Sequence, residues 1–415
     1  MCFHTLLVTI ADTQNFSSAE AGSSGISWIC LPDRYFCTLQ IISLVILGVI
    51  MSNKRVTILG GGNTAFSVAA RLSHIGTSVC ILEHPDFAET ISTIARTKTI
   101  TLEGVMETGP VAVEKVTLDP KEALDFADLL LLIVPAYAHR PFAQFCAPHL
   151  KNSHTVVIMP GTMGTLEWNE ISKEFGVSDV TVAEVDTAPY VCRKTSDSGA
   201  VIWGEVSTLG LGVFPSSQST QVSEMLKPLF SNISLYDDVV ACGLSAMNPV
   251  VHPAGVLMNA GRVEYSRGEF YFYEEGVSSS VAKVIETVDE ERRSIGKALG
   301  YELMPVGEAF HAAGFGPSGN IWEAINGSHM LTRLKAPGSL ESRWLTEDIP
   351  YGIAVWSKLG TQYGVETPVI DSLVSLGSVV MGLDGWEEGR GLMDLGISGL
   401  SKSELKDFLH IGNTA

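Results

Sequence analysis

One segment of the chain brings together side chains that could transfer protons. Residues 245–264 contain His252 together with the amides Asn248 and Asn259. Histidine is the side chain best suited to acid–base chemistry near neutral pH. Pro253 follows directly, and proline favours the first turn of a helix, so we expect the imidazole near a helix N-terminus that faces a cleft. A histidine in an apolar stretch can also be a core residue, and both interpretations stay open on spacing alone.

A second polar segment, residues 340–352, contains Arg343, Trp344, Glu347 and Asp348. A guanidinium offers planar, paired donors that suit a phosphate or a carboxylate. By spacing alone, the segment is equally consistent with a loop whose charges pair with one another.

A phosphate-binding turn is predicted where a short apolar run, residues 55–59, ends in glycines. Gly60 permits a tight turn, and Gly62 lets the backbone approach a pyrophosphate. Ala65 occupies the third small position, which allows close packing of helix against strand. The helix that follows has free N–H groups and the positive end of its dipole at its N-terminus, where phosphates bind. Its first residues are Asn63 and Thr64.

An acidic residue stands where a ribose is expected. A second apolar run, residues 78–82, ends at Glu83, which lies 23 residues after Gly60. An acid at this place typically binds the ribose hydroxyls of NAD and repels a 2′-phosphate. His84 and Pro85 bring no guanidinium that could compensate. We therefore predict NADH as the cofactor, with NADPH possible.

Further apolar runs indicate strands of one parallel sheet that is buried on both faces. These runs are residues 127–134, 155–159 and 181–184. Ligands of such sheets bind at the carboxyl ends of the strands. This rule points to Pro135, to the loop 160–164 and to Glu184. His139 could meet the nicotinamide ribose or a substrate there, or it could simply pack.

The character of the chain changes after about residue 240. Helical periodicity dominates, with an apolar stripe from Val281 to Leu299 that follows Ser278 and stops at Gly300. The predicted fold class is α/β: a Rossmann dinucleotide-binding domain over residues 51–240, followed by a mainly α-helical substrate and catalytic domain over residues 241–415.

Composition excludes some function classes. The 415 residues carry a formal net charge of -19, which argues against a nucleic-acid partner because such binding needs a basic face. The seven cysteines are scattered without a close pair, so neither a disulfide framework nor a metal site is predicted. This pattern fits a reducing compartment, and we expect a cytoplasmic protein.

The first fifty residues do not fit the rest of the design. An apolar run over residues 35–51 has about the minimum length of a membrane span, and polar side chains weaken it. Our preferred interpretation is that translation starts at Met51 and that residues 1–50 are an upstream extension outside the fold. A membrane anchor through residues 35–51 is the less favoured alternative, and a targeting segment is a third.

Taken together, the motifs resemble those of the octopine/nopaline (opine) dehydrogenases. The matching segments follow the order of that family across residues 54–412, whereas residues 1–50 have no counterpart. Ala65 is a small departure, because many members carry glycine there. The motifs are Gly60–Asn63, Val134–His139, Pro160–Gly161, Ala183–Glu184, Thr187–Arg193, Asn248–Pro253, Asn259–Arg262, Asp289–Arg292, Ala298–Gly300, Arg343–Pro350 and Thr367–Pro368.

The resemblance implies an enzyme that condenses an amino acid with an α-keto acid reductively, using NADH or NADPH, to give a secondary amine dicarboxylate. It implies that His252 is the general acid/base and is paired with Asp348. It also implies that Arg343 binds the cofactor pyrophosphate and that Glu184 contacts the amino-acid substrate. The remaining candidates are Pro135 for the cofactor and His139 and Asn248 for the substrate.

Other functions remain possible. A two-domain reductase of the glycerol-3-phosphate or ketopantoate type shares the first domain but uses a catalytic lysine, and no lysine lies between Asn248 and Glu264. A non-catalytic dinucleotide sensor would have no need of His252, Arg343 and Asp348. Within the family, an opine-type metallophore synthase stays open.

Overall fold

The structure is a computed structural model, and it describes residues 54–412, which belong to one compact unit. The predictions about residues 1–50, the anchor at 35–51 and the start at Met51 fall outside these described residues.

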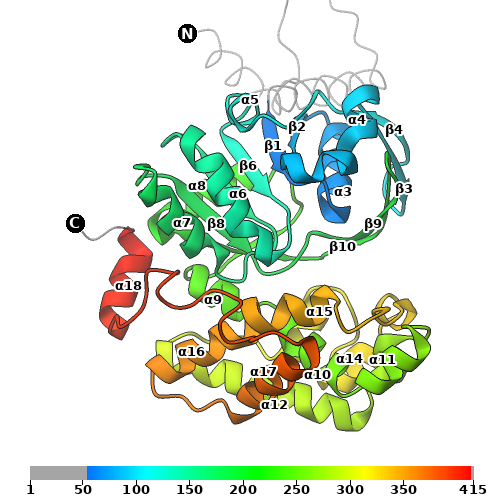
Figure 1. Ribbon diagram of the computed structural model, residues 1–415, viewed down its shortest axis with the longest axis vertical. Coiled ribbons are helices and arrows are strands. Elements are labelled where there is room, and N and C mark those ends of the chain that lie inside the picture. Colours follow the sequence, from blue (N-terminus) through cyan, green and yellow to red (C-terminus); the bar gives the residue numbers. More distant parts are fainter. Residues whose placement is uncertain (1–53, 413–415) are drawn as a thin grey trace, which may run out of the picture. The chain divides into compact units, whose positions relative to one another are not determined.

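An eight-stranded sheet organises the first half of the described chain (Figure 1). Its strand order is β12-β11-β8-β7-β6-β1-β2-β5, and neighbours pair in parallel except β8 with β11. The predicted strands at residues 55–59, 78–82, 127–134, 155–159 and 181–184 are therefore confirmed as neighbours in one sheet. The strand bounds are β1 Arg55–Leu59, β2 Ser78–Leu82, β5 Lys115–Thr117, β6 Leu129–Leu132, β7 Thr155–Ile158, β8 Thr181–Val185, β11 Leu209–Phe214 and β12 Ile233–Leu235.

Both faces of this sheet are covered, which explains why its central strands are apolar throughout. Alternate side chains of β1 enter two different cores: Val56 and Ile58 pack with helix α3, and Leu59 packs with α5, α6 and α7. The helices of this half are α3 Asn63–His74, α4 Ser92–Thr97, α5 Pro120–Leu124, α6 His139–Cys146, α7 Gly164–Glu174 and α8 Ser219–Leu226. Short helical turns cover Pro85–Ile91, Ala136–Ala138, Ala147–His149 and Ser216–Gln218.

A small second sheet lies beside α3, with strand order β4-β3-β10-β9. Its strands are β3 Thr99–Gly104, β4 Gly109–Ala112, β9 Tyr190–Ser196 and β10 Gly199–Glu205. No signal in the sequence predicted this sheet, because its strands are partly exposed and lack the continuous apolar runs of the main sheet.

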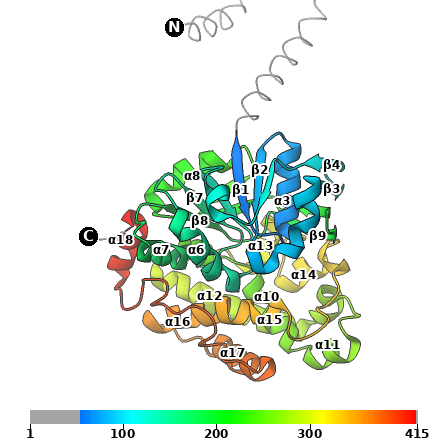
Figure 2. The same ribbon diagram turned by 45° about the horizontal axis from the view of Figure 1, so that its top comes forward.

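Helices make up the second half of the described chain, and beyond β12 it contains no further named strand (Figures 1 and 2). The predicted stripe forms α12, with Ser278 as its N-cap and Gly300 as its left-handed C-cap. The helices are α9 Val239–Leu244, α10 Asn248–Leu257, α11 Ala260–Ser266, α12 Ser279–Leu299, α13 Val306–Ala312, α14 Ile321–Asn326, α15 Arg343–Thr346, α16 Ala354–Gln362, α17 Pro368–Met381 and α18 Lys402–Ile411. Two π-helical turns, Phe272–Gly276 and Asp348–Ile353, and a 3-10 turn, Leu331–Arg333, complete it.

The last helix, α18, returns to the first half of the chain (Figure 1). The Phe408 ring lies 5.0 Å from the Phe214 ring, and the Lys173 amine lies 5.4 Å from the centre of the Phe408 ring. The two halves are therefore joined by a direct contact as well as by the chain.

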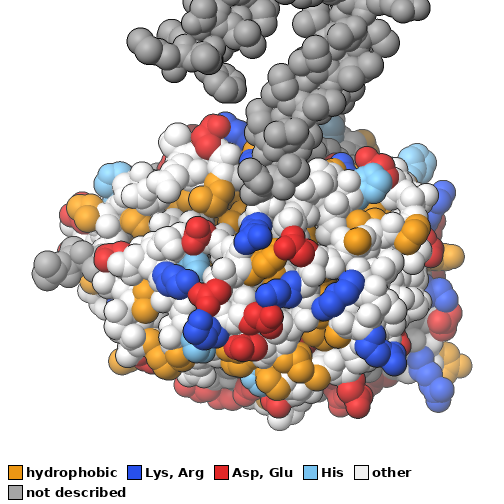
Figure 3. All heavy atoms as spheres, turned by 90° about the horizontal axis from the view of Figure 1, so that it is seen from above, with side chains coloured by type: hydrophobic (Ala, Val, Ile, Leu, Met, Phe, Trp, Pro, Cys, Tyr) orange, Lys and Arg blue, Asp and Glu red, His pale blue; other side chains and the backbone are white. Residues whose placement is uncertain are grey.

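One stretch of the described residues, Val239–Leu257, is long and apolar enough to cross a membrane by composition, but 89% of it is buried within the protein. It comprises α9 and α10 of the helical core. On the face shown in Figure 3, acidic and basic side chains are interspersed rather than gathered by sign.

Candidate active site

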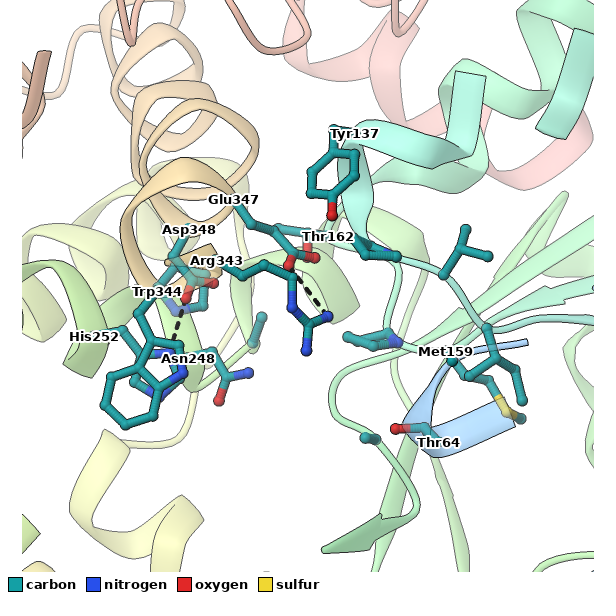
Figure 4. A pocket seen from close by; sticks show the side chains of 18 of the residues that line it. Thr64, Tyr137, Met159, Thr162, Asn248, His252, Arg343, Trp344, Glu347 and Asp348 are labelled. Carbon is teal, nitrogen blue, oxygen red and sulfur yellow. Dashed lines mark hydrogen bonds and ion pairs between the residues drawn. The ribbon is translucent and has the colours of Figure 1, made fainter. Parts of the chain in front are cut away.

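A cavity of about 350 Å³ lies where the glycine turn after β1 faces the helical half (Figure 4). It is lined by both halves of the chain. Its residues are Gly62, Asn63, Thr64, Ile133, Val134, Pro135, Tyr137, Met159, Pro160, Thr162, Asp186, Ala188, Ala246, Asn248, Pro249, His252, Arg343, Trp344, Glu347 and Asp348. The predicted cofactor residue Pro135 and the predicted substrate residue Asn248 are thus on its wall.

The glycine turn has the geometry that a pyrophosphate needs. Gly60 has φ +119°, and a Cβ there would lie 2.6 Å from a Val134 methyl and 2.7 Å from the Ile133 carbonyl oxygen. A Cβ on Gly62 would meet nothing within 4 Å. Helix α3 starts at the next residue with no side-chain cap and no acid in its first turn. Its N–H groups and dipole are therefore available to an anion in the open space beside Gly62.

The neighbours of the turn differ in what they contact. The Asn63 side-chain oxygen accepts the Lys194 backbone N–H at 3.0 Å, which joins the turn to the second sheet. Thr64 lines the cavity, and Ala65 is 1% exposed and packs in the core beneath the helix. Asn63 lines the cavity as well, and Figure 4 shows the Thr64 side chain on the sheet side of it.

Glu83 lies at the carboxyl end of β2, next to the glycine turn rather than on the cavity wall. One of its oxygens accepts the His84 N–H at 2.8 Å, and the other lies 3.5 Å from the Thr90 hydroxyl. Burial raises the pKa of the Glu83 carboxyl, and the hydrogen bonds from His84 and Gly61 oppose this shift. Its position beside the turn is the one expected of a ribose ligand.

His252 is held on both of its ring nitrogens. Nδ1 lies 2.8 Å from Asp348, and Nε2 lies 3.0 Å from the Tyr273 hydroxyl. An acceptor at Nδ1 fixes the tautomer and stabilises an imidazolium, so Nε2 is the nitrogen that can exchange a proton. The structure thus brings together the two residues that were predicted to form an acid–base pair.

The helix that carries His252 differs from the prediction in one respect. Helix α10 begins at Asn248, and Pro249 occupies its first turn. The expectation that Pro253 marks the first turn is wrong, because Pro253 lies inside the helix. His252 is consequently one turn further along, and the N-terminus of α10 presents Asn248 to the cavity instead.

Aromatic rings keep this imidazole in place. The Trp344 ring stacks on His252 with 4.2 Å between centroids and 6° between planes. Phe272 meets Trp344 edge to face at 4.6 Å. His252 itself is 6% exposed, so it is largely shielded from water while it remains on the cavity wall.

Arg343 and Glu347 extend from α15 and its C-terminal end into the cavity (Figure 4). The guanidinium is directed from the helical half toward Thr64 and Met159 on the sheet side. Its Nη1 lies 3.8 Å from Glu347, and the arginine side chain is 57% exposed. The exposed guanidinium is therefore accessible to an anion in the cavity, as the predicted pyrophosphate contact requires.

Glu184 was predicted to contact substrate, but the structure places it elsewhere. It is fully buried and is not on the cavity wall. Its two oxygens accept the N–H groups of Met163 at 2.8 Å and Thr165 at 3.1 Å. It thereby supports a loop in which Thr162 and Met163 have positive φ, at 49° and 65°. The arrangement supports a role in shaping this cavity loop and does not support direct substrate contact.

His139 also lies behind the cavity wall. It is 1% exposed, and its Nδ1 lies 3.1 Å from the Arg390 guanidinium. Arg390 is itself buried and donates to the carbonyl oxygens of Ala136, Gly161 and Thr162. Of the two interpretations left open for His139, packing is the one that this geometry supports.

Four residues of this region had no predicted role: Asp186, Tyr273, Arg390 and Glu347, the last of which was named only as part of the polar segment 340–352. Asp186 follows β8, so the strand-end rule could have found it, whereas Tyr273 and Arg390 carry no local signal. Partly buried on the cavity wall, Asp186 accepts from the Tyr236 hydroxyl at 2.9 Å and from the Gly210 N–H at 3.0 Å. Burial raises its pKa to about 6.

Two further observations concern the chemistry. No lysine is among the residues that line the cavity in the described part of the chain. Within that same part, no group of three or more His, Cys, Asp or Glu side chains is arranged to hold a metal ion.

Comparisons with known proteins show which families the two halves of the chain resemble. Residues 235–381 match the family described as NAD/NADP octopine/nopaline dehydrogenase, alpha-helical domain, and residues 55–160 match the one described as NADP oxidoreductase coenzyme F420-dependent. An opine dehydrogenase from Arthrobacter sp. (strain 1C) is 30% identical over 358 residues, which cover 86% of this chain and 99% of that protein.

Solved structures share the fold. Octopine dehydrogenase with NADH and L-arginine has a TM-score of 0.70 at 20% identity, covering 88% of this chain and 99% of that one. NADP+-bound yersinopine dehydrogenase has a TM-score of 0.66 at 14% identity, covering 86% and 98%. Because the Arthrobacter relative is matched at 30% identity over almost its whole length, the chain belongs to the opine dehydrogenase family.

Proposed function

We propose that this protein uses NADH to condense an amino acid with an α-keto acid reductively, which gives an N-(carboxyalkyl) amino acid. The observation that carries the proposal is a single cavity with the glycine turn on one wall and the His252–Asp348 pair on the other. A dinucleotide site and an acid–base pair that share one cavity are what a nicotinamide-dependent reduction needs. Family membership supports the same reaction class.

The residues present fit a dinucleotide. The open space beside Gly62 and the uncapped N-terminus of α3 would hold the pyrophosphate, with Arg343 as a counter-charge from the helical half. Glu83 would accept from the adenosine ribose hydroxyls. Pro135 would line the cofactor side. When bound, the reduced nicotinamide supplies the hydride.

His252 would act as the general acid/base of the reaction. An amine and a keto acid join with loss of water to give an imine, whose carbon receives the hydride and whose nitrogen takes up one proton, so that a secondary amine forms. Protonated Nε2 of His252 would donate a hydrogen bond to the oxygen or nitrogen at the reacting carbon, while Asp348 stabilises the imidazolium. The Tyr273 hydroxyl is hydrogen-bonded to Nε2 of His252 in this structure. The hydroxyl must therefore move away when the substrate binds to Nε2, or it must relay the proton from Nε2 to the substrate.

NADH is the preferred cofactor in this proposal. The Glu83 carboxylate would repel a 2′-phosphate at the end of β2. The relatives carry both types, since the octopine dehydrogenase structure contains NADH and the yersinopine dehydrogenase structure contains NADP+. NADPH therefore stays possible as a weaker cofactor.

The proposed division of the chain has two domains. Residues 51–240 would form the dinucleotide-binding domain and residues 241–415 the substrate and catalytic domain. The change from strands to helices after β12, which ends at Leu235, supports this division. A cytoplasmic location stays a prediction.

The test is oxidation of NADH by the purified protein against a matrix of amino acids and α-keto acids. We expect the absorbance of the reduced nicotinamide to fall only when both substrates are present. Oxidation with a keto acid alone would favour a reductase of the ketopantoate type, although the cavity offers no lysine for that chemistry. Tight NADH binding without turnover on any pair would favour the sensor.

A further inference from the structure

Glu347 connects the two halves of the chain inside the cavity. Its Oε1 accepts the backbone N–H of Ala136, which follows β6, at 2.8 Å. Its Oε2 lies 3.8 Å from the Arg343 guanidinium. In Figure 4 its carboxylate lies between that guanidinium and the loop that carries Tyr137. Neither contact belongs to the His252–Asp348 pair, so Glu347 has a role distinct from that pair.

The charged groups around Glu347 have opposite effects on the pKa of its carboxyl. Asp348 is its neighbour in the chain and is bonded to His252, Arg390 of the helical half also acts on it, and Tyr137 faces it from the first half of the chain. Burial and the Asp348 charge raise the pKa of Glu347 to about 7, against the lowering effect of Arg343, the Ala136 N–H and Arg390. The surroundings of this carboxyl therefore favour its neutral form more than those of an ordinary glutamate do.

Arg343 is the one Lys or Arg side chain among the described residues that line the cavity. It is at present the nearest cation to Glu347. An anion bound at the N-terminus of α3 would draw the guanidinium toward itself and would also bring negative charge into the same small cavity. Both effects disfavour an ionised carboxylate.

We propose that Glu347 takes up a proton when the dinucleotide pyrophosphate binds, and that the protonation of this one carboxyl sets the affinity for the cofactor. The inference rests on the proposed function, because it assumes that the cavity holds a dinucleotide. The proton comes from solvent and returns to it when the dinucleotide leaves. Oε1 can still accept the Ala136 N–H in the neutral acid, so the bond between the two halves survives the change.

The first test uses the wild-type protein. NADH binding is measured by calorimetry near pH 7.5 in buffers of different ionisation enthalpy, and the slope gives the number of protons taken up. We expect the protein to take up a measurable fraction of one proton for each NADH bound. Since one pKa unit corresponds to tenfold in an equilibrium, we also expect the NADH Kd to rise about three- to tenfold from about pH 6.5 to about pH 8. Binding without proton uptake would overturn the inference.

The second test identifies the group that takes up the proton. Glu347→Gln keeps the size and the carbonyl acceptor for Ala136 but cannot titrate. It should bind NADH with an affinity close to that of the wild type at low pH, with little dependence on pH and no proton uptake. A matched variant, Asp186→Asn, removes the other carboxyl on the cavity wall whose pKa is raised, and it should keep the pH dependence.

The outcomes separate the two proposals. If the wild type does not bind NADH at all, the proposed function fails. If NADH binds and Glu347→Gln retains the proton uptake, only the role of Glu347 fails. Intrinsic tryptophan fluorescence and thermal melting of Glu347→Gln establish that it is folded, and the wild-type calorimetry decides the question even if it is not.

Discussion

Replacing Gly62 with aspartate should abolish dinucleotide binding without harming the fold. A Cβ on Gly62 meets nothing within 4 Å, so the new side chain has room. The backbone there has φ −77° and ψ −173°, which is the conformation of an N-cap residue. Aspartate is a favoured N-cap, and its charge suits the positive end of a helix dipole. We expect the melting temperature of Gly62→Asp to stay the same or rise slightly, by the equivalent of about 0.3–1 kcal/mol.

The same carboxylate would stand in the place of the pyrophosphate. Two like charges at about 4 Å and an effective dielectric of about 20 repel by about 4 kcal/mol, which is roughly a thousandfold in affinity. The assay is NADH titration by calorimetry or by quenching of tryptophan fluorescence. We expect binding to weaken by at least this factor, beyond the range of the measurement.

Two control variants separate charge from shape. Gly62→Asn has nearly the same size and also caps helices, so the difference between the two variants isolates the charge. Gly60→Ala should instead destabilise the protein, because φ is +119° and the new Cβ would collide with Val134 and the Ile133 carbonyl. Wild-type NADH affinity in a folded Gly62→Asp protein would refute the placement of the phosphate site.

Three further predictions concern the chemistry, the cofactor and stability. His252→Ala should lower kcat about 10²- to 10⁴-fold in steady-state assays, and combining it with Asp348→Asn should add little because the pair acts as a unit; additive losses would separate the two roles. Glu83→Gln should improve kcat/KM for NADPH relative to NADH, and an unchanged ratio would remove Glu83 from ribose recognition. Because burial raises the folded-state pKa of Asp186 to about 6, above its ordinary value of 3.8, the stability that its proton gives is lost as pH rises through this window. Between about pH 5 and pH 7.5, urea unfolding should show the wild type losing about 1 kcal/mol relative to Asp186→Asn, and a constant difference would contradict the shift.

The parts of the fold that sequence could predict are those specified locally. The run into Gly60 and Gly62 predicts strand, turn and helix because each residue type is required by the backbone at its own position. Continuous apolar runs predicted the central strands because burial on both faces leaves no place for polar side chains. The apolar stripe that ends at Gly300 predicted α12, because its helical periodicity and its capping residues indicate the same helix.

The rest depends on contacts between distant segments. His252 and Asp348 are 96 residues apart, and only the resemblance to a family paired them. Nothing in the sequence near Tyr273 indicates that its hydroxyl meets His252. Glu184 and Asp186 both lie at the end of β8, and the loop that folds over Glu184 buries the one and leaves the other beside the cavity. The strand-end rule finds the edge of a sheet, but the loops decide which side chain is accessible.

Deuterium transfer tests the central claim most directly. The purified protein is incubated with an amino acid, an α-keto acid and NADH that carries deuterium at C4 of the nicotinamide, and the product is analysed by mass spectrometry. The account predicts a secondary amine that joins both substrates and carries one deuterium on the former keto carbon. Formation of a deuterated 2-hydroxy acid, with the amino acid left unchanged, would contradict it.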